Sequence, residues 1–155
     1  MWNKIKPYII GVAIALGVGA LSAFLTRNNM MVYKGIDKPP LAPPSALFPI
    51  VWTILFILMG ISSAMVYTKD GGEQKKALFI YAVQLVVNFF WSIIFFNMQA
   101  YLFAFIWLIL LWLLIILMIY EFSKVSKVAA WLQVPYLLWV TFAGYLNLMI
   151  YILNK

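Results

Sequence analysis

The chain has 155 residues, of which 66% are hydrophobic and only 10% are charged, and its mean hydropathy is +1.01. Soluble domains average roughly 45–50% apolar and about 25% charged residues, so this composition excludes an ordinary water-soluble fold and indicates a surface that faces lipid. The net charge of +7 does not indicate nucleic-acid binding, because the basic residues lie singly or in pairs at the ends of apolar runs. Histidine and cysteine are absent, so the sequence predicts no metal site, no thiol nucleophile and no histidine base.

Five apolar segments are long enough to cross a bilayer, which takes about 20 residues. In chain order they cover residues 7–26, 46–68, 77–96, 99–120 and 128–153. The connections at 69–76, 97–99 and 121–127 are short, and short connections join antiparallel neighbours. The first segment is longer than a signal-peptide core, which favours a span over a leader. We therefore predict one all-α membrane domain over residues 1–155, a bundle of five transmembrane helices.

The connection at residues 27–45 is the long one, and it contains the run Pro39-Pro40-Leu41-Ala42-Pro43-Pro44. Proline fixes φ and cannot donate a backbone hydrogen bond, so this tract is stiff and is not helical throughout. Long loops in compact proteins are often lids or binding loops, with a disordered linker as the alternative. The stiffness and the apolar residues favour a lid that lies on the end of the bundle.

Basic residues are unevenly divided between the two ends of the predicted bundle. One end carries the following seven: Lys4, Lys6, Lys69, Lys75, Lys76, Lys124 and Lys127. The other end carries four: Arg27, Lys34, Lys38 and Lys155. Because cytoplasmic segments are enriched in Lys and Arg, we expect the amino terminus in the cytoplasm and the carboxy terminus outside, for a bacterial plasma membrane.

The predicted spans hold amides but no clearly embedded charge, which argues against an ion pump. Gln84, Asn88 and Trp91 share one helical face, either as hydrogen bonds between helices or as part of a binding surface. In the last span Trp139, Ala143 and either Leu146 or Asn147 share a face by the same spacing.

Proline also marks the last span. Pro135 obstructs the carbonyl of Trp131, and a bend is expected there. Such a bend beside a small residue either opens a cavity or only accommodates packing.

Three tryptophans lie too deep for the aromatic belt at the membrane surface. Trp52, Trp91 and Trp139 are all predicted in the half of the bundle beneath the proline-rich loop. Trp107 and Trp112, in contrast, have no polar signal beside them in the sequence and are expected to face lipid or to be packed. A pocket with aromatic walls and one or two amides suits a flat, largely apolar ligand.

Three stretches of the sequence resemble one family, the tryptophan-rich sensory proteins and translocator proteins (TspO/MBR family), formerly called peripheral benzodiazepine receptors. These stretches are residues 33–52 (YKGIDKPPLAPPSALFPIVW), residues 84–92 (QLVVNFFWS) and residues 135–147 (PYLLWVTFAGYLN). Val32 stands where the family usually has Trp, Ile93 where Pro commonly follows Trp-Ser, and Pro49 is displaced by one place. These departures concern the shape of helix ends.

The resemblance implies a five-helix fold, often dimeric, that binds porphyrins and isoquinoline carboxamide or benzodiazepine drugs in a pocket closed by the first loop. Carried over by motif, the ligand contacts are Tyr33, Pro43, Trp52, Phe56, Asn88, Trp91, Trp139, Ala143 and Leu146. No cofactor is obligatory, and porphyrin is implied as ligand or substrate. Membrane lipids and a second copy of the chain are the expected partners, and no nucleic acid is expected.

A small-residue stripe, Gly11-x3-Ala15-x3-Gly19, suits either that dimer or close packing inside the monomer. Leu148, Tyr151 and Lys155 match a cholesterol-contact pattern too loose to predict sterol binding.

Three functions remain open from the sequence. The first is a membrane receptor or sensor for tetrapyrroles such as protoporphyrin IX and haem-type porphyrins. The second is an enzyme that breaks down porphyrin with light and oxygen; it has no conventional catalytic residue, so Trp52 and Trp139 are the candidates for photochemistry. The third is a porphyrin or sterol transporter, which the sequence supports least because it shows no inverted repeat.

Overall fold

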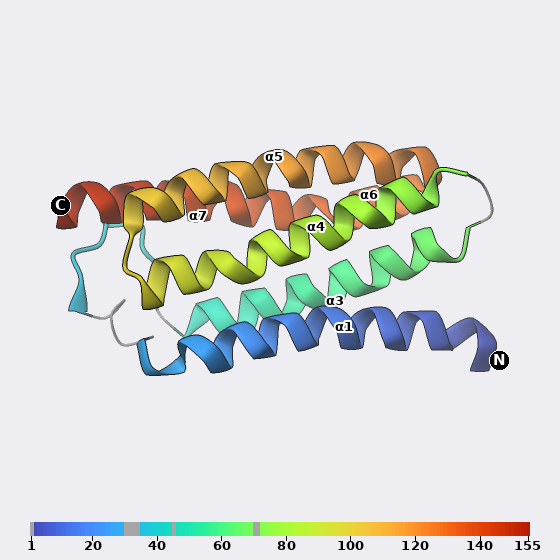
Figure 1. Ribbon diagram of the computed structural model, residues 1–155, viewed down its shortest axis with the longest axis horizontal. Coiled ribbons are helices and arrows are strands. Elements are labelled where there is room, and N and C mark those ends of the chain that lie inside the picture. Colours follow the sequence, from blue (N-terminus) through green and yellow to red (C-terminus); the bar gives the residue numbers. More distant parts are fainter. Residues whose placement is uncertain (1, 30–34, 45, 70–71) are drawn as a thin grey trace.

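The computed structural model describes residues 2–29, 35–44, 46–69 and 72–155, and within those ranges every regular element is a helix. The elements are α1 (Trp2–Thr26), a 3-10 turn (Arg27–Asn29), α3 (Leu47–Tyr67), α4 (Gln74–Ser92), a π-helical turn (Ile93–Asn97), α5 (Tyr101–Val125), α6 (Lys127–Leu132) and α7 (Val134–Asn154). They form five apolar segments of membrane-spanning length, which confirms the predicted five-span bundle. The segments run up and down along one long axis, with the two termini at opposite ends (Figure 1).

Three helices extend beyond their predicted bounds, because polar residues continue them instead of ending them. α1 begins at Trp2, five residues before the predicted start, and so includes Lys4 and Lys6. α4 begins at Gln74, whose Nε2 donates to the carbonyl of Lys69 (3.0 Å) and so closes the connection from α3. α5 continues to Val125, through most of the segment predicted as a turn. The chain leaves the helical conformation only at Ser126, whose Oγ caps the next helix by accepting from the Ala129 amide (3.2 Å).

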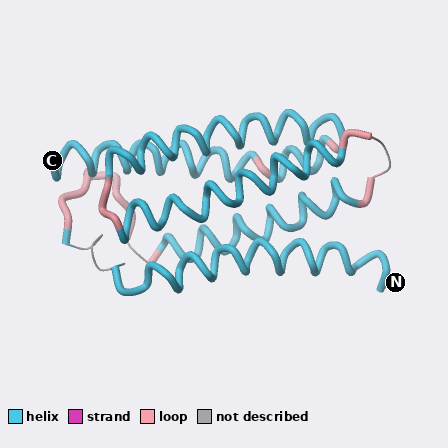
Figure 2. Tube along the Cα trace, in the orientation of Figure 1, coloured by secondary structure: helices cyan, strands magenta, loops and turns pink. Residues whose placement is uncertain are grey.

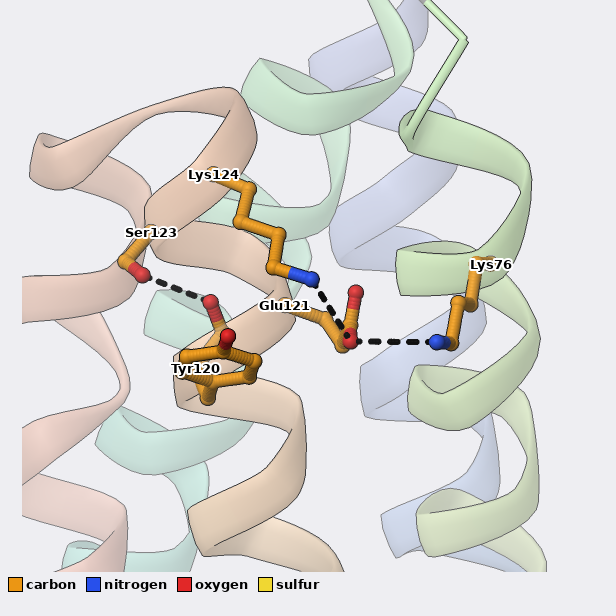
Figure 3. A network of polar contacts seen from close by, with 5 residues as sticks. All are labelled: Lys76, Tyr120, Glu121, Ser123 and Lys124. Atoms are coloured by element: carbon orange, nitrogen blue, oxygen red, sulfur yellow. Dashed lines mark hydrogen bonds and ion pairs between the residues drawn. The ribbon is translucent and has the colours of Figure 1, made fainter.

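The buried carboxylate of Glu121 explains why that predicted turn is wrong. Its side chain is 2% exposed, and its Oε1 lies 3.4 Å from both Lys76 Nζ on α4 and Lys124 Nζ one turn along α5. Figure 3 shows the two ammonium groups approaching the carboxylate from neighbouring helices. The charged residues Lys76, Glu121 and Lys124 therefore form a packed contact between α4 and α5 rather than a solvated loop.

The last span is divided in two at Gln133. α6 ends at Leu132 and α7 begins at Val134, with Pro135 in the first turn of α7, where its missing amide donor would be unpaired in any case. This interruption lies within the stretch from Trp131 to Pro135 where the bend is expected. It lets α6 pack against α3 and α5 while α7 packs against α5 (Figure 2).

α1 and α3 make a close contact, and glycines make it possible. A Cβ on Gly60 would lie 2.4 Å from the Val12 Cα, and one on Gly11 would lie 2.6 Å from the Gly60 carbonyl oxygen. A Cβ on Gly19 would meet the Phe56 ring at 2.6 Å, and Ala15 between them is fully buried. The small-residue stripe of α1 is therefore used inside the monomer, where it lets two backbones touch.

Candidate functional site

A cavity of about 560 Å³ lies between α1, α3, α4 and α7, in the half of the bundle where α3 begins and the other three helices end. That volume is within the usual range for small-molecule sites, about 300–1,000 Å³. α1 contributes mainly small side chains, including Gly19, Ala20 and Ala23, whereas aromatic residues dominate the other walls. The small side chains of α1 therefore leave space for the cavity.

Seven of the nine predicted contact residues line this cavity: Trp52, Phe56, Asn88, Trp91, Trp139, Ala143 and Leu146. They come from three helices that are far apart in sequence. Pro43 is half-buried in the proline-rich loop and is not among the lining residues. Tyr33 lies outside the described residues.

Tyr136 is the residue in the middle of the buried polar network, and the predicted contact set lacks it. Its hydroxyl accepts from Asn88 Nδ2 and donates to Gln84 Oε1, both at 2.6 Å, so it joins the two amides of α4 to α7. The Trp52 ring meets the Tyr136 ring edge-on, with centroids 6.2 Å apart. Since Asn88 and Trp52 line the cavity, Tyr136 holds two of its walls in place from behind. The signal was its spacing, one helical turn before Trp139.

A second network orients Trp91. Its indole Nε1 donates to Asn147 Oδ1 (3.0 Å), and Asn147 Nδ2 donates to the carbonyl of Tyr101 (2.8 Å). The ring also stacks on Phe95, with centroids 5.1 Å apart. The Asn147 amide thus links α4, α5 and α7 at the depth of the cavity. Because this amide pairs the indole N–H, Trp91 contributes an apolar ring to the cavity wall.

Trp139 differs from Trp91 in the hydrogen bonding of its indole N–H. The ring packs against Phe48 and Phe142, with centroids 5.8 and 5.6 Å away. Its Nε1 is buried and has no hydrogen-bond acceptor in the part of the chain that the structure describes. A buried donor without an acceptor is costly. An oxygen or nitrogen acceptor in the cavity would reach this N–H only if the ring turned toward the cavity, because the nitrogen itself is buried.

Trp107 and Trp112 are packed, as one of the two expectations for them has it, and each has a polar partner that the sequence did not signal. Trp107 Nε1 donates to the Val87 carbonyl (2.7 Å), and Trp112 Nε1 donates to Thr141 Oγ1 (2.8 Å). Both bonds join α5 to a neighbouring helix. These two tryptophans do not line the cavity, and their hydrogen bonds hold neighbouring helices together.

The end of α4 widens into the π-helical turn Ile93–Asn97. A π turn inserts one extra residue per hydrogen-bonded ring and redirects the side chains that follow. Here it brings Phe95 and Phe96 onto the cavity wall.

The proline-rich loop is attached to the end of α7. The Asp37 amide donates to Asn154 Oδ1 (3.0 Å), and Asn154 Nδ2 donates back to the Asp37 carbonyl (2.8 Å). Ile36 and Phe48, on either side of the proline tract, pack on the cluster around Phe95 and Ile150. The described part of the loop therefore lies on the end of the bundle nearest the cavity (Figure 1).

The described residues contain no group of three or more His, Asp, Glu or Cys side chains that would hold a metal ion. What the cavity offers is aromatic surface, a few amides and one unpartnered indole donor. Such a set recognises a flat apolar molecule with at least one hydrogen-bond acceptor.

The fold and the cavity define a five-helix integral membrane protein with an aromatic cavity inside one half of its bundle. The chain belongs to the TspO/MBR family, whose model matches residues 10–153. It is 42% identical over 147 residues to the tryptophan-rich protein TspO of Chlorobaculum tepidum, covering 94% of this chain and 92% of that protein. It is 34% identical to the TspO of Archaeoglobus fulgidus over 97% and 99% of the two chains, and 35% identical to the translocator protein of Bos taurus over 83% and 79%.

Proposed function

We propose that this protein is a membrane receptor or sensor that binds tetrapyrroles, such as protoporphyrin IX and haem-type porphyrins, in the cavity between α1, α3, α4 and α7. The same cavity would accept isoquinoline carboxamide and benzodiazepine drugs. The observation that carries the proposal is the pairing of Trp52 and Trp139 on the cavity wall with an unpartnered indole donor at Trp139.

Aromatic rings bind flat π-systems through offset or edge contacts worth about 0.5–1.5 kcal/mol each beyond apolar burial. A porphyrin or an aryl carboxamide offers that surface, and it carries oxygen or nitrogen acceptors for the Trp139 N–H. The described charged residues at this end of the bundle are Arg27, Lys38 and Lys155 against Asp37. That surplus of positive charge suits the carboxylates at the edge of a porphyrin.

The proline-rich loop would close over the bound ligand, since Asn154 already attaches it to the end of α7. The positive-inside bias supports a plasma-membrane orientation with the amino terminus in the cytoplasm. A homodimer would use a surface other than the small-residue stripe of α1, because that stripe already packs on α3.

Quenching of tryptophan fluorescence by protoporphyrin IX tests the proposal in detergent or nanodiscs. Trp52→Phe and Trp139→Phe should each weaken binding about two- to tenfold, the range for one aromatic contact. Trp131→Phe is the matched control, because Trp131 is 72% exposed and does not line the cavity. Unchanged affinity in both cavity variants would place the ligand elsewhere.

A second candidate function is oxidative breakdown of bound porphyrin with light and oxygen. It is favoured by one observation: Trp52 and Trp139, both oxidisable indoles, line the same cavity. Illumination of the complex should then produce a new chromophore that fails to form in Trp52→Phe or Trp139→Phe. Identical bleaching of porphyrin without protein would exclude this activity.

A further inference from the structure

A second groove lies at the opposite end of the bundle from the cavity, between α1, α3 and α4, with a volume of about 570 Å³. α1 lines it from Lys6 to Ile14, a length of about 12 Å along the helix axis. Leu78, Ala82 and Leu85 of α4 form the facing side. The groove therefore runs from the membrane edge toward the middle of the bilayer.

The groove has an exposed rim and a buried floor. Lys6, Ile14 and Tyr67 are exposed at its sides, whereas Ser63 and Tyr81 are buried beneath. In a membrane protein, exposed apolar walls at this depth are in contact with lipid. An elongated groove of this kind fits an acyl chain better than a globular ligand.

The polar groups of the groove are a cation at the membrane edge and hydroxyls on the floor. Lys6 takes part in neither of the two ion pairs found in the described residues. Ser63 and Tyr81 belong to the buried floor beneath these walls. A phospholipid matches this arrangement, because its phosphate can pair with Lys6 at the membrane edge while an acyl chain lies along the apolar walls.

We propose that this groove is a binding site for an anionic phospholipid, with the phosphate at Lys6 and one acyl chain between α1 and α4. The positive charge at this end of the bundle favours an anionic lipid, rather than a second copy of the chain, as the occupant of the groove. The same end carries Lys4, Lys69, Lys75 and Lys127, so a copy in the same orientation would bring like charges against it. An anionic headgroup is attracted by each of these residues.

Native mass spectrometry of the detergent-solubilised protein tests the site with phosphatidylglycerol and with phosphatidylcholine of the same acyl chains. Lys6→Gln should weaken phosphatidylglycerol binding about fivefold, the contribution expected of one lysine near an anionic surface. Lys4→Gln is the control, because Lys4 has the same charge and exposure but does not line the groove. Phosphatidylcholine should bind more weakly and should not respond to Lys6→Gln.

Filling the groove gives an independent test. Ala82→Trp should abolish the bound lipid, and Val86→Trp, one turn away on an exposed part of α4 outside the groove, should leave it in place. Circular dichroism checks that both variants keep their helices. Equal effects of Lys6→Gln and Lys4→Gln, equal binding of the two lipids, or lipid retained in Ala82→Trp would overturn the proposal. So would loss of a dimer in Ala82→Trp, which would make a second copy the occupant.

Discussion

The Asn88 amide donates to the Tyr136 hydroxyl at 2.6 Å, so a cavity-lining residue of α4 is held in position by a fully buried residue of α7. The same hydroxyl donates to Gln84, and the Trp52 ring rests edge-on against its ring. Three of the helices that line the cavity, α3, α4 and α7, therefore meet at the phenol side chain of Tyr136. The rotamer of Asn88 and the position of the Trp52 indole both depend on it.

Tyr136→Phe should destabilise the protein by about 1–2 kcal/mol, because it leaves the buried Asn88 and Gln84 amides each without a partner. Unfolding of the purified protein in mixed micelles measures the loss. The partly exposed Tyr145 of the same helix supplies the control, Tyr145→Phe, which should change little. Equal stability of the two variants would contradict the role given to Tyr136.

Gly60→Ala should cost about 1–3 kcal/mol of stability, because the added Cβ meets the α1 backbone at 2.4 Å and the two helices must separate. Gly17→Ala on α1 adds the same methyl group where nothing lies within 4 Å. It should be neutral or stabilising, since alanine favours helix. Thermal unfolding in detergent compares the two, and a harmless Gly60→Ala would show that α1 and α3 do not touch as closely as described.

Asn154→Ala should speed both association and release of the ligand, because it removes the two hydrogen bonds that hold the Asp37 backbone on α7. Stopped-flow fluorescence with protoporphyrin IX measures the rates, and release should rise up to about tenfold, as expected for one or two net hydrogen bonds. The neighbouring Lys155→Ala serves as control. Release rates unaffected by Asn154→Ala would show that the loop does not limit exchange.

Removing both cations around Glu121 should destabilise the protein more than removing either one. Lys76→Gln with Lys124→Gln leaves a carboxylate of 2% exposure without a counter-charge, whereas each single variant keeps one. Adding Glu121→Gln should restore much of the stability, because the buried charge is then gone. The midpoint of thermal unfolding across these four variants is the measurement, and absence of rescue would contradict an electrostatic cause.

The five spans could be predicted because the length and apolarity of a transmembrane helix are strongly constrained by the bilayer. The cavity could be anticipated for a related reason. Trp139, Ala143 and Leu146 follow helical spacing, and antiparallel order brings their helix beside those of Trp52 and Asn88. Periodicity and chain direction were sufficient to place these side chains in one half of the bundle.

Pairwise contacts could not be predicted in the same way, because they depend on the rotation of each helix about its axis. In the sequence Tyr136 is one more aromatic residue in an apolar run, whereas in the structure its hydroxyl lies between two amides. A charge near a span end is usually solvated, so the sequence predicts a turn at Glu121, whereas the structure buries its side chain. The stripe from Gly11 to Gly19 suits two partners by sequence, and the structure shows α3 against it.

The backbone contact between Gly60 and α1 also bears on how the cavity can change volume. Two helices that meet backbone to backbone can neither rotate nor slide past one another without breaking the contact, so α1 and α3 should move as one rigid unit on one side of the cavity. On the other side, α7 follows the break at Gln133 and α4 ends in the π-helical turn, and helices bend readily at such points. Adjustment to ligands of different size should therefore come from α7 and the end of α4.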